Sequence, residues 1–180
     1  MKTFTNPTKV VTGICTFSYL NCWDAKSING SAPKFSVSLI IPKSDTKTID
    51  KIKAAIQAAY EEGQAKLKGN GKSVPALSIL KTPLRDGDVE RPDDPVYKNS
   101  YFINANSSTA PGIVDADRNQ IMDRSEMYSG VKGRASINHT SRKESACRRT
   151  RLRKKDIGFQ KKQLIWIQWL IQTSFLTYIR

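Results

Sequence analysis

Aromatic and basic side chains are interleaved along the segments of this chain that are richest in β-forming residues. The aromatic members are Phe17, Tyr19, Trp23, Phe35, Tyr97, Tyr101, Phe102 and Tyr128, and the basic members are Lys34, Lys81, Arg85, Lys98 and Arg134. Aromatic rings can stack on any nucleobase, and lysine and arginine can neutralise phosphates. The mixture therefore suits a protein that holds a single-stranded nucleic acid without reading its sequence. Each stacked base can contribute about 1–3 kcal/mol.

Aromatic residues in strands also fill protein cores, and for any single ring in this set a core position is favoured over contact with nucleic acid. Three members of the set fit a core less well. Lys34 lies on the polar face of its predicted strand, and Tyr19 and Trp23 belong to the polar stretch SYLNCWD. These three are therefore the first candidates for contact with a ligand.

The charge of the chain is basic and unevenly spread. The 180 residues carry a formal net charge of +14, and nine of these charges fall in residues 139–180. A basic surface favours anionic partners such as nucleic acid, acidic lipid or acidic protein, and the alternative is a solvated basic protein without such a partner. The N-terminus has no apolar stretch of signal-peptide length.

The residues that most enzymes and metal sites require are sparse. His139 is the only histidine, and the three cysteines, Cys15, Cys22 and Cys147, have no CxxC spacing. This pattern argues against Ser-His-Asp or Cys-His catalysis, a zinc site and a disulfide framework. We interpret the cysteines as reduced thiols, which are typical of cytoplasmic proteins. The sequence predicts no enzyme, no cofactor and no metal.

One acidic stretch comes close to a calcium-binding loop. Residues 115–126 place acidic or amide side chains at positions 1, 3, 5, 9 and 12 of such a loop. Position 6, which needs glycine for its sharp turn, is Gln120. The flanking residues do not resemble helices either, so we interpret the stretch as an acidic hairpin loop.

The apolar pattern predicts mostly strands. Residues 10–19 are rich in β-branched and aromatic side chains, and residues 34–42 alternate between an apolar and a polar face. A short strand is predicted at residues 76–80, another at residues 100–107, short β pieces around the acidic loop, and a further strand at residues 133–138. Turn residues separate these segments.

A single long helix is predicted between residues 44 and 69. Ser44 or Asp45 can cap its N-terminus, and an apolar stripe recurs at three- and four-residue spacing. The stripe consists of Ile49, Ile52, Ile56, Ala59 and Gly63. Short strands with frequent turns and one substantial helix indicate a mainly β (α+β) fold, either a small barrel or a sandwich.

Six blocks of sequence, in order, resemble a family of bacteriophage single-stranded DNA-binding proteins that was formerly a domain of unknown function. The blocks are TGICTFSYLNCW, PKFSVSLIIPKSDTKTIDKIKAAI, LKTPLRDGD, YFINANS, PGIVDAD and YSGVKGRASIN, and they span about residues 8–138. The resemblance implies an oligonucleotide-binding (OB) barrel in residues 1–138 that binds single-stranded DNA with little sequence preference during phage replication or recombination. It implies cytoplasmic location in the bacterial host, and phage replication proteins and a second copy of the chain as further partners.

On the matching blocks, the resemblance and the aromatic or basic residue type together select the expected DNA contacts. They are Tyr19, Trp23, Lys34, Phe35, Lys81, Arg85, Tyr101, Phe102 and Arg134. Two other functions stay open at this point. One is an RNA-binding OB protein, and the other is a membrane-associated basic protein that uses residues 161–180, although that apolar segment is short for a membrane span.

The chain departs from the family pattern after the strand GRASIN. Residues 139–180 form a basic and then an apolar tail, where the family pattern has a further strand and an acidic end. We hypothesise a change of reading frame near His139, which would leave the barrel incomplete at its C-terminal strand. We expect residues 1–138 to be the binding domain and residues 139–180 to be a poorly ordered tail.

Overall fold

The computed structural model describes residues 6–27, 30–68, 73–74, 76–139 and, for the backbone, 165–173. The strands are β1 Lys9–Val11, β2 Cys15–Lys26, β3 Lys34–Pro42, β4 Leu84–Asp86, β5 Ser100–Ser107, β6 Gly112–Val114, β7 Lys132–His139 and β8 Ile165–Thr173. The helices are α1 Thr46–Lys68 and the single turn α2 Gly87–Glu90, with 3₁₀ turns at Leu77–Ile79, Pro95–Tyr97 and Arg124–Glu126. The prediction of a mainly β fold with one substantial helix is confirmed.

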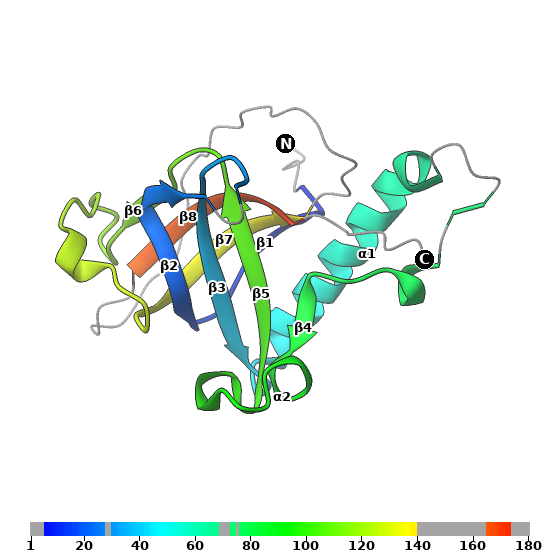
Figure 1. Cartoon of the computed structure of the whole chain (residues 1–180), viewed down its shortest axis with the longest axis horizontal. Coiled ribbons are helices and arrows are strands. Elements are labelled where there is room, and N and C mark those ends of the chain that lie inside the picture. Colours follow the sequence, from blue (N-terminus) through cyan, green and yellow to red (C-terminus); the bar gives the residue numbers. More distant parts are fainter. Residues whose placement is uncertain (1–5, 28–29, 69–72, 75, 140–164, 174–180) are drawn as a thin grey trace.

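The strands form one curled sheet in the order β4-β5-β3-β2-β7-β8-β6, and β1 also pairs with β7. All pairs are antiparallel except β7 with β8. Figure 1 shows β2, β3 and β5 as one layer, with β1, β7 and β8 crossing behind it and α1 beyond one end. The result is a half-open OB-like barrel, as the resemblance implied.

The segment predicted as one strand over residues 10–19 is instead two strands, because the chain bends at residues 12–14. Gly13 lies against the N-terminus of α1, where its amide donates to Thr48 Oγ1 at 2.8 Å. A Cβ atom at this position would clash with the Asp45 carboxylate, so a larger residue would have to displace the side chain that caps α1. The bend lets β1 and β2 pair with different parts of the same neighbour, β7.

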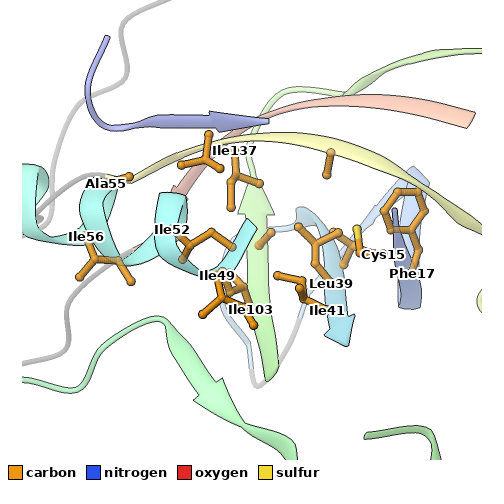
Figure 2. Packing of buried hydrophobic residues seen from close by; sticks show 14 of the residues in the cluster. Cys15, Phe17, Leu39, Ile41, Ile49, Ile52, Ala55, Ile56, Ile103 and Ile137 are labelled. Atoms are coloured by element: carbon orange, nitrogen blue, oxygen red, sulfur yellow. The ribbon is translucent and has the colours of Figure 1, made fainter. Parts of the chain in front are cut away.

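The core lies between the two layers of strands and is closed by α1. Figure 2 shows Ile49 and Ile52 of the helix directed toward strand residues such as Ile103 and Ile137, and Ile56 belongs to the same buried cluster. Asp45 caps the helix by accepting from the amide of Thr48 at 3.2 Å. The predicted cap and the predicted apolar stripe are both confirmed. None of the helices within the described residues is long and apolar enough to cross a membrane.

Two further predictions about the elements change. Residues 77–79 form a 3₁₀ turn where a strand was predicted, and the strand begins only at Leu84. In addition, the face of β3 predicted to be polar is covered at Ser38 and Ile40, because Tyr97 and Phe102 pack over it. The acidic segment forms a hairpin loop, as interpreted, with Val114 bridged to Gln120.

The C-terminal edge of the sheet differs from the expectation of an open barrel edge. The backbone of β8 lies between β7 and β6, so the position beside β7 is occupied. Residues 140–164 and 174–180, which include the basic run, lie outside the described residues. The division of the chain at residue 138 therefore stays a prediction.

Candidate nucleic-acid interface

The sheet has a face directed away from the core, which we call the outer face. The pairing register assigns to it Thr16, Ser18 and Asn21 of β2, Ser36, Ser38 and Ile40 of β3, Arg85 of β4, and Phe102, Asn104 and Asn106 of β5. Alternate residues on the same strands, such as Leu39 and Ile103, are fully buried in the core. Figure 1 shows the strands β2, β3 and β5 side by side, so the outer face is continuous across all three. In OB folds, the second and third long strands of the barrel present such a face to oligonucleotides.

A cluster of two guanidinium groups and three aromatic rings lies at the α2 end of this face. We call it the Arg91 cluster; its members are Tyr19, Arg85, Arg91, Tyr97 and Phe102. The central carbon of the Arg91 guanidinium lies 4.6 Å from the centroid of the Tyr97 ring, 5.3 Å from that of Tyr19 and 5.4 Å from that of Phe102. Each such contact can contribute about 0.5–2 kcal/mol, depending on its exposure. The rings therefore hold Arg91 in one orientation.

Within the described residues, no carboxylate forms an ion pair with Arg91. Its neighbour Arg85 lies 4.4 Å from the centroid of Phe102 and forms an ion pair with Glu90 at 2.9 Å. Arg91 is thus oriented by the rings and has no ion-pair partner among the described residues, whereas an anion that binds Arg85 would have to share it with Glu90. Both guanidinium groups are suited to bidentate contact with phosphate.

The buried part of the cluster fixes the position of the two arginines. Phe102 and Tyr97 are fully buried, and their rings meet edge to face with centroids 5.0 Å apart. The Tyr97 hydroxyl donates to Ser38 Oγ at 3.1 Å, which ties the loop before β5 to β3. Gly87 permits the close approach of α2, because a Cβ atom there would lie 2.3 Å from the Tyr97 carbonyl oxygen.

Lys43, which directly follows β3, stabilises the beginning of the segment that connects β4 to β5. Its ammonium group forms ion pairs with Asp86 at 2.9 Å and with Asp88 at 2.7 Å. The hydrogen bonds to these carboxylates raise the pKa of Lys43 and lower the pKa of Asp88, so both stay charged. Asp86 also caps α2 by accepting from the amide of Asp88. Asp86 and Asp88 are therefore engaged in building the loop.

Tyr19 lies at a bulge in β2 and is 59% exposed. Its φ is 48°, in the left-handed region that bulky residues rarely occupy. The bulge is held from the neighbouring turn, because the Leu20 amide donates to Ser129 Oγ at 3.0 Å and the Gly130 amide donates to the Phe17 carbonyl at 2.6 Å. A strained backbone that directs an aromatic ring to solvent is a feature of functional sites.

The residues predicted as contacts fall into three groups. Tyr19, Lys34 and Lys81 are exposed, and Arg85 and Arg134 are half-buried. Trp23, Phe35 and Tyr101 are half-buried and pack against the core, so each has only part of its ring at the surface. Phe102 has no exposed surface. No face of its ring is therefore open to a stacked base, and the guanidinium groups of Arg85 and Arg91 pack on the ring instead.

The structure brings together only some of these residues. Tyr19, Arg85 and Phe102 meet in the Arg91 cluster. Lys34 lies opposite Lys26, which is also exposed, at the other end of the outer face. Trp23 is half-buried, and its Nε1 is buried and has no hydrogen-bond partner among the described residues.

Sequence reasoning missed Arg91, the residue at the centre of the cluster. Arg91 lies in the stretch VERPDDPVYKN, which has the composition of a polar loop and has acidic residues on both sides. A usable signal was the aromatic Tyr97 six residues later, which has no place on the surface of a polar loop. Asn104 and Asn106 were also missed as candidates, although the alternation of β5 already placed Asn104 opposite the apolar face.

Burial shifts the pKa of three titratable groups in the core. Burial raises the pKa of the Cys15 thiol to about 12 and that of Cys22 to about 11, which keeps both protonated near neutral pH. Burial also lowers the pKa of His139 to about 4. No group of acidic, cysteine or histidine side chains within the described residues is placed to hold a metal ion.

Comparison with known proteins gives a consistent picture. The family model described as Enterobacter phage Enc34, ssDNA-binding protein, matches residues 8–153. The match continues beyond residue 138, where the resemblance seen in the sequence ended. A search of curated protein sequences found no match.

Solved structures of phage proteins share the fold. A C-terminally truncated single-stranded DNA-binding protein from bacteriophage Enc34 is 20% identical with a TM-score of 0.62, over 95% of this chain and 87% of the other. The same phage's protein in complex with single-stranded DNA is 21% identical with a TM-score of 0.61, over 96% and 88%. The single-stranded DNA-binding protein gp2.5 of bacteriophage T7 is 12% identical with a TM-score of 0.51, over 95% and 93%.

Proposed function

The chain belongs to the family of the Enterobacter phage Enc34 single-stranded DNA-binding protein, and from this membership and the geometry of the outer face we propose that it binds single-stranded DNA. The observation that carries the proposal is the Arg91 cluster. Among the described residues the Arg91 guanidinium has no ion-pair partner, and three rings hold it, one of them the exposed ring of Tyr19, on the face that OB folds use for oligonucleotides.

The mechanism combines two kinds of contact. Arg91, Arg85 and the lysines at the opposite end of the face neutralise phosphates, and the exposed ring of Tyr19 stacks on a base. Neither contact reads the identity of a base strongly, so we expect binding to many sequences. Because phosphate neutralisation releases counterions, the affinity falls steeply as salt is added.

The rest of the proposal follows from the family. We place the protein in phage DNA replication or recombination, in the cytoplasm of the bacterial host, with a binding role and no catalytic step. Other phage replication proteins and a second copy of the chain are its proposed further partners. Of the sequence-predicted contacts, we retain Tyr19, Lys34, Lys81, Arg85 and Arg134, and the exposed parts of Trp23, Phe35 and Tyr101.

The test is the binding of labelled single-stranded and duplex DNA by the full chain, measured by fluorescence anisotropy at two salt concentrations. We expect the single strand to bind more tightly than the duplex. Arg91→Ala should weaken binding of the single strand about tenfold, because it removes both a phosphate contact and the partner of the Tyr19 ring. Equal affinity of the wild type and Arg91→Ala would contradict the proposed site.

Two further variants separate the effects of charge and shape. Arg91→Lys keeps the positive charge but loses the planar group that the rings hold, so we expect it to recover only part of the affinity. Lys53→Ala removes one positive charge from an exposed position of α1, away from the outer face, and serves as the matched control. Loss of affinity in Lys53→Ala equal to that in Arg91→Ala would show that overall charge, and not the cluster, drives binding.

A further inference from the structure

Between the Arg91 cluster and the lysine pair, the outer face carries a row of uncharged polar side chains. Asn104 of β5 lies opposite Ser38 of β3, and Asn106 lies opposite Ser36. Asn21 of β2 lies opposite Ser36 from the other side. Hydroxyl and amide groups thus fill the middle of the face, and the positive charges lie at its two ends.

The two asparagines of β5 are free to bind a ligand. Both are exposed, and the side chain of neither forms a hydrogen bond within the described part of the chain. By contrast, Asn21 is engaged, because its amide nitrogen donates to Ser36 Oγ at 3.0 Å and to the Tyr19 carbonyl at 3.2 Å. Among the described strands, β4 pairs with β5 only at Tyr101–Ile103, so it stops short of both asparagines.

The position of this pair relative to the charges determines what it can touch. A strand whose phosphates contact the arginines at one end and Lys34 at the other must cross the middle of the face. Lys34 and Ile40 are six positions apart on β3, and Ile40 lies opposite Phe102. At the rise of an extended strand, six positions correspond to a distance of about 20 Å. Bases in that span meet no exposed aromatic ring from β3 or β5, and they meet the two amides instead.

We propose that Asn104 and Asn106 form hydrogen bonds with base edges and give the site a preference for adenine. This inference rests on the proposed function and adds a base preference to it. An asparagine amide has a donor beside an acceptor and pairs bidentately with a base edge that presents the complementary arrangement. The Watson–Crick edge of every unpaired base presents a donor beside an acceptor, but only adenine also presents the pair on its N6/N7 edge, so only adenine can pair whichever of these two edges it turns to the protein.

The test compares deoxyadenosine and deoxythymidine homo-oligomers of equal length with the full chain. The measured quantity is the ratio of the two dissociation constants, in the wild type and in the double variant Asn104→Ala/Asn106→Ala. Intrinsic stacking within the adenosine oligomer affects both proteins equally, so it cancels when the two ratios are compared. We expect the double variant to shift the ratio against adenosine about fivefold, the low end of what one bidentate pair discriminates.

Two controls keep the result interpretable. Asn104→Thr/Asn106→Thr retains strand-forming side chains but lacks the donor–acceptor pair, so it should shift the ratio as the alanine variant does. Gln64→Ala removes an exposed amide of α1, away from the outer face, and should leave the ratio unchanged.

An unchanged ratio in both double variants would overturn this inference, even if their affinity for both oligomers fell together. That outcome would leave the proposed function standing. Failure of the wild type to bind either oligomer would overturn the proposed function, and this inference with it.

Discussion

On β3 and β5 the inner face is mostly apolar and buried, whereas the outer face of the same strands is mostly polar and partly open to solvent. Leu39, Ile41 and Ile103 lie on the first, and Ser36, Asn104 and Asn106 on the second. Successive residues of a strand point to opposite sides, so the residues that pack the core and the residues that face a ligand alternate along the same strand and can be changed separately. Substitutions on the inner face should change stability, and those on the outer face should change binding.

The largest effect is expected at the inner face. Ile52→Ala removes a fully buried side chain of α1 from the centre of the core (Figure 2), and should lower the free energy of unfolding by about 2–5 kcal/mol. The affinity of the molecules that stay folded should not change. Urea denaturation followed by far-ultraviolet circular dichroism, and a DNA titration below the midpoint, measure the two quantities. A loss of affinity in the folded variant would show that the two faces are coupled.

The fully buried His139 makes the stability of the fold depend on pH. Burial lowers its pKa from an ordinary value of 6.5 to about 4. The unfolded chain therefore binds more protons between these values, and stability is complete above pH 6.5 and falls as the pH is lowered toward 4. The loss is at most about 3 kcal/mol at 1.36 kcal/mol per pKa unit. His139→Gln should flatten the dependence in this window, and a slope equal to that of the wild type would assign it to carboxylates.

The inner face was also the more predictable one. The spacing of Ile49, Ile52 and Ile56 predicted the apolar side of α1, and the alternation of β3 predicted the apolar residues of its inner face, although Ser38 and Ile40 on the other face are buried as well. These patterns are local, because a periodicity of 3.6 or 2 is written in consecutive residues. The bend at residues 12–14 escaped prediction, since it depends on the contact between Gly13 and Asp45, which are distant in sequence.

The candidate site was only partly predictable for the same reason. Tyr19 and Lys34 could be selected by type and by polar neighbours, and both are exposed. Arg91 could not, because its role comes from three rings that belong to β2, β5 and the 3₁₀ turn before β5. Phe102 shows the opposite error: its type suggested stacking on a base, but the fold buries it under Arg85.

The C-terminal region is the part on which sequence and structure agree least. We placed a departure from the family near His139, yet the family match continues to residue 153 and β8 lies beside β7. The basic run at 148–155 lies outside the described residues. The hypothesis of a changed reading frame stays a prediction that resequencing of the gene would test.

Phe102 is where the two faces are expected to be coupled. Phe102→Leu keeps most of the buried volume, so the cost in stability should be about 1 kcal/mol. The same change removes the ring beneath both guanidiniums without altering any charge. Affinity for single-stranded DNA should fall about fivefold or more, because two cation–π contacts are lost and each is worth about 0.5–1 kcal/mol at a partly exposed site. An unchanged affinity would show that charge alone orients the arginines.

The smallest effect is expected from a carboxylate at the rim of the outer face. Glu90 forms an ion pair with Arg85 at 2.9 Å, and both side chains are partly exposed. A phosphate that approaches Arg85 must compete with this carboxylate, whereas Arg91 has no such competitor among the described residues. Glu90→Gln should therefore raise the affinity about twofold to fivefold at low salt, in line with the 0.2–1 kcal/mol of exposed pairs.

The gain from Glu90→Gln should shrink as salt is added, because added ions screen an exposed pair. Asp93→Asn removes a negative charge from the same loop without breaking an ion pair, so it separates the release of Arg85 from a general change in charge. Equal gains in the two variants would mean that the loop acts on DNA through its net charge. A gain confined to Glu90→Gln would show that Arg85 is held back from phosphate by its partner, and that the outer face binds DNA with one free and one competed arginine.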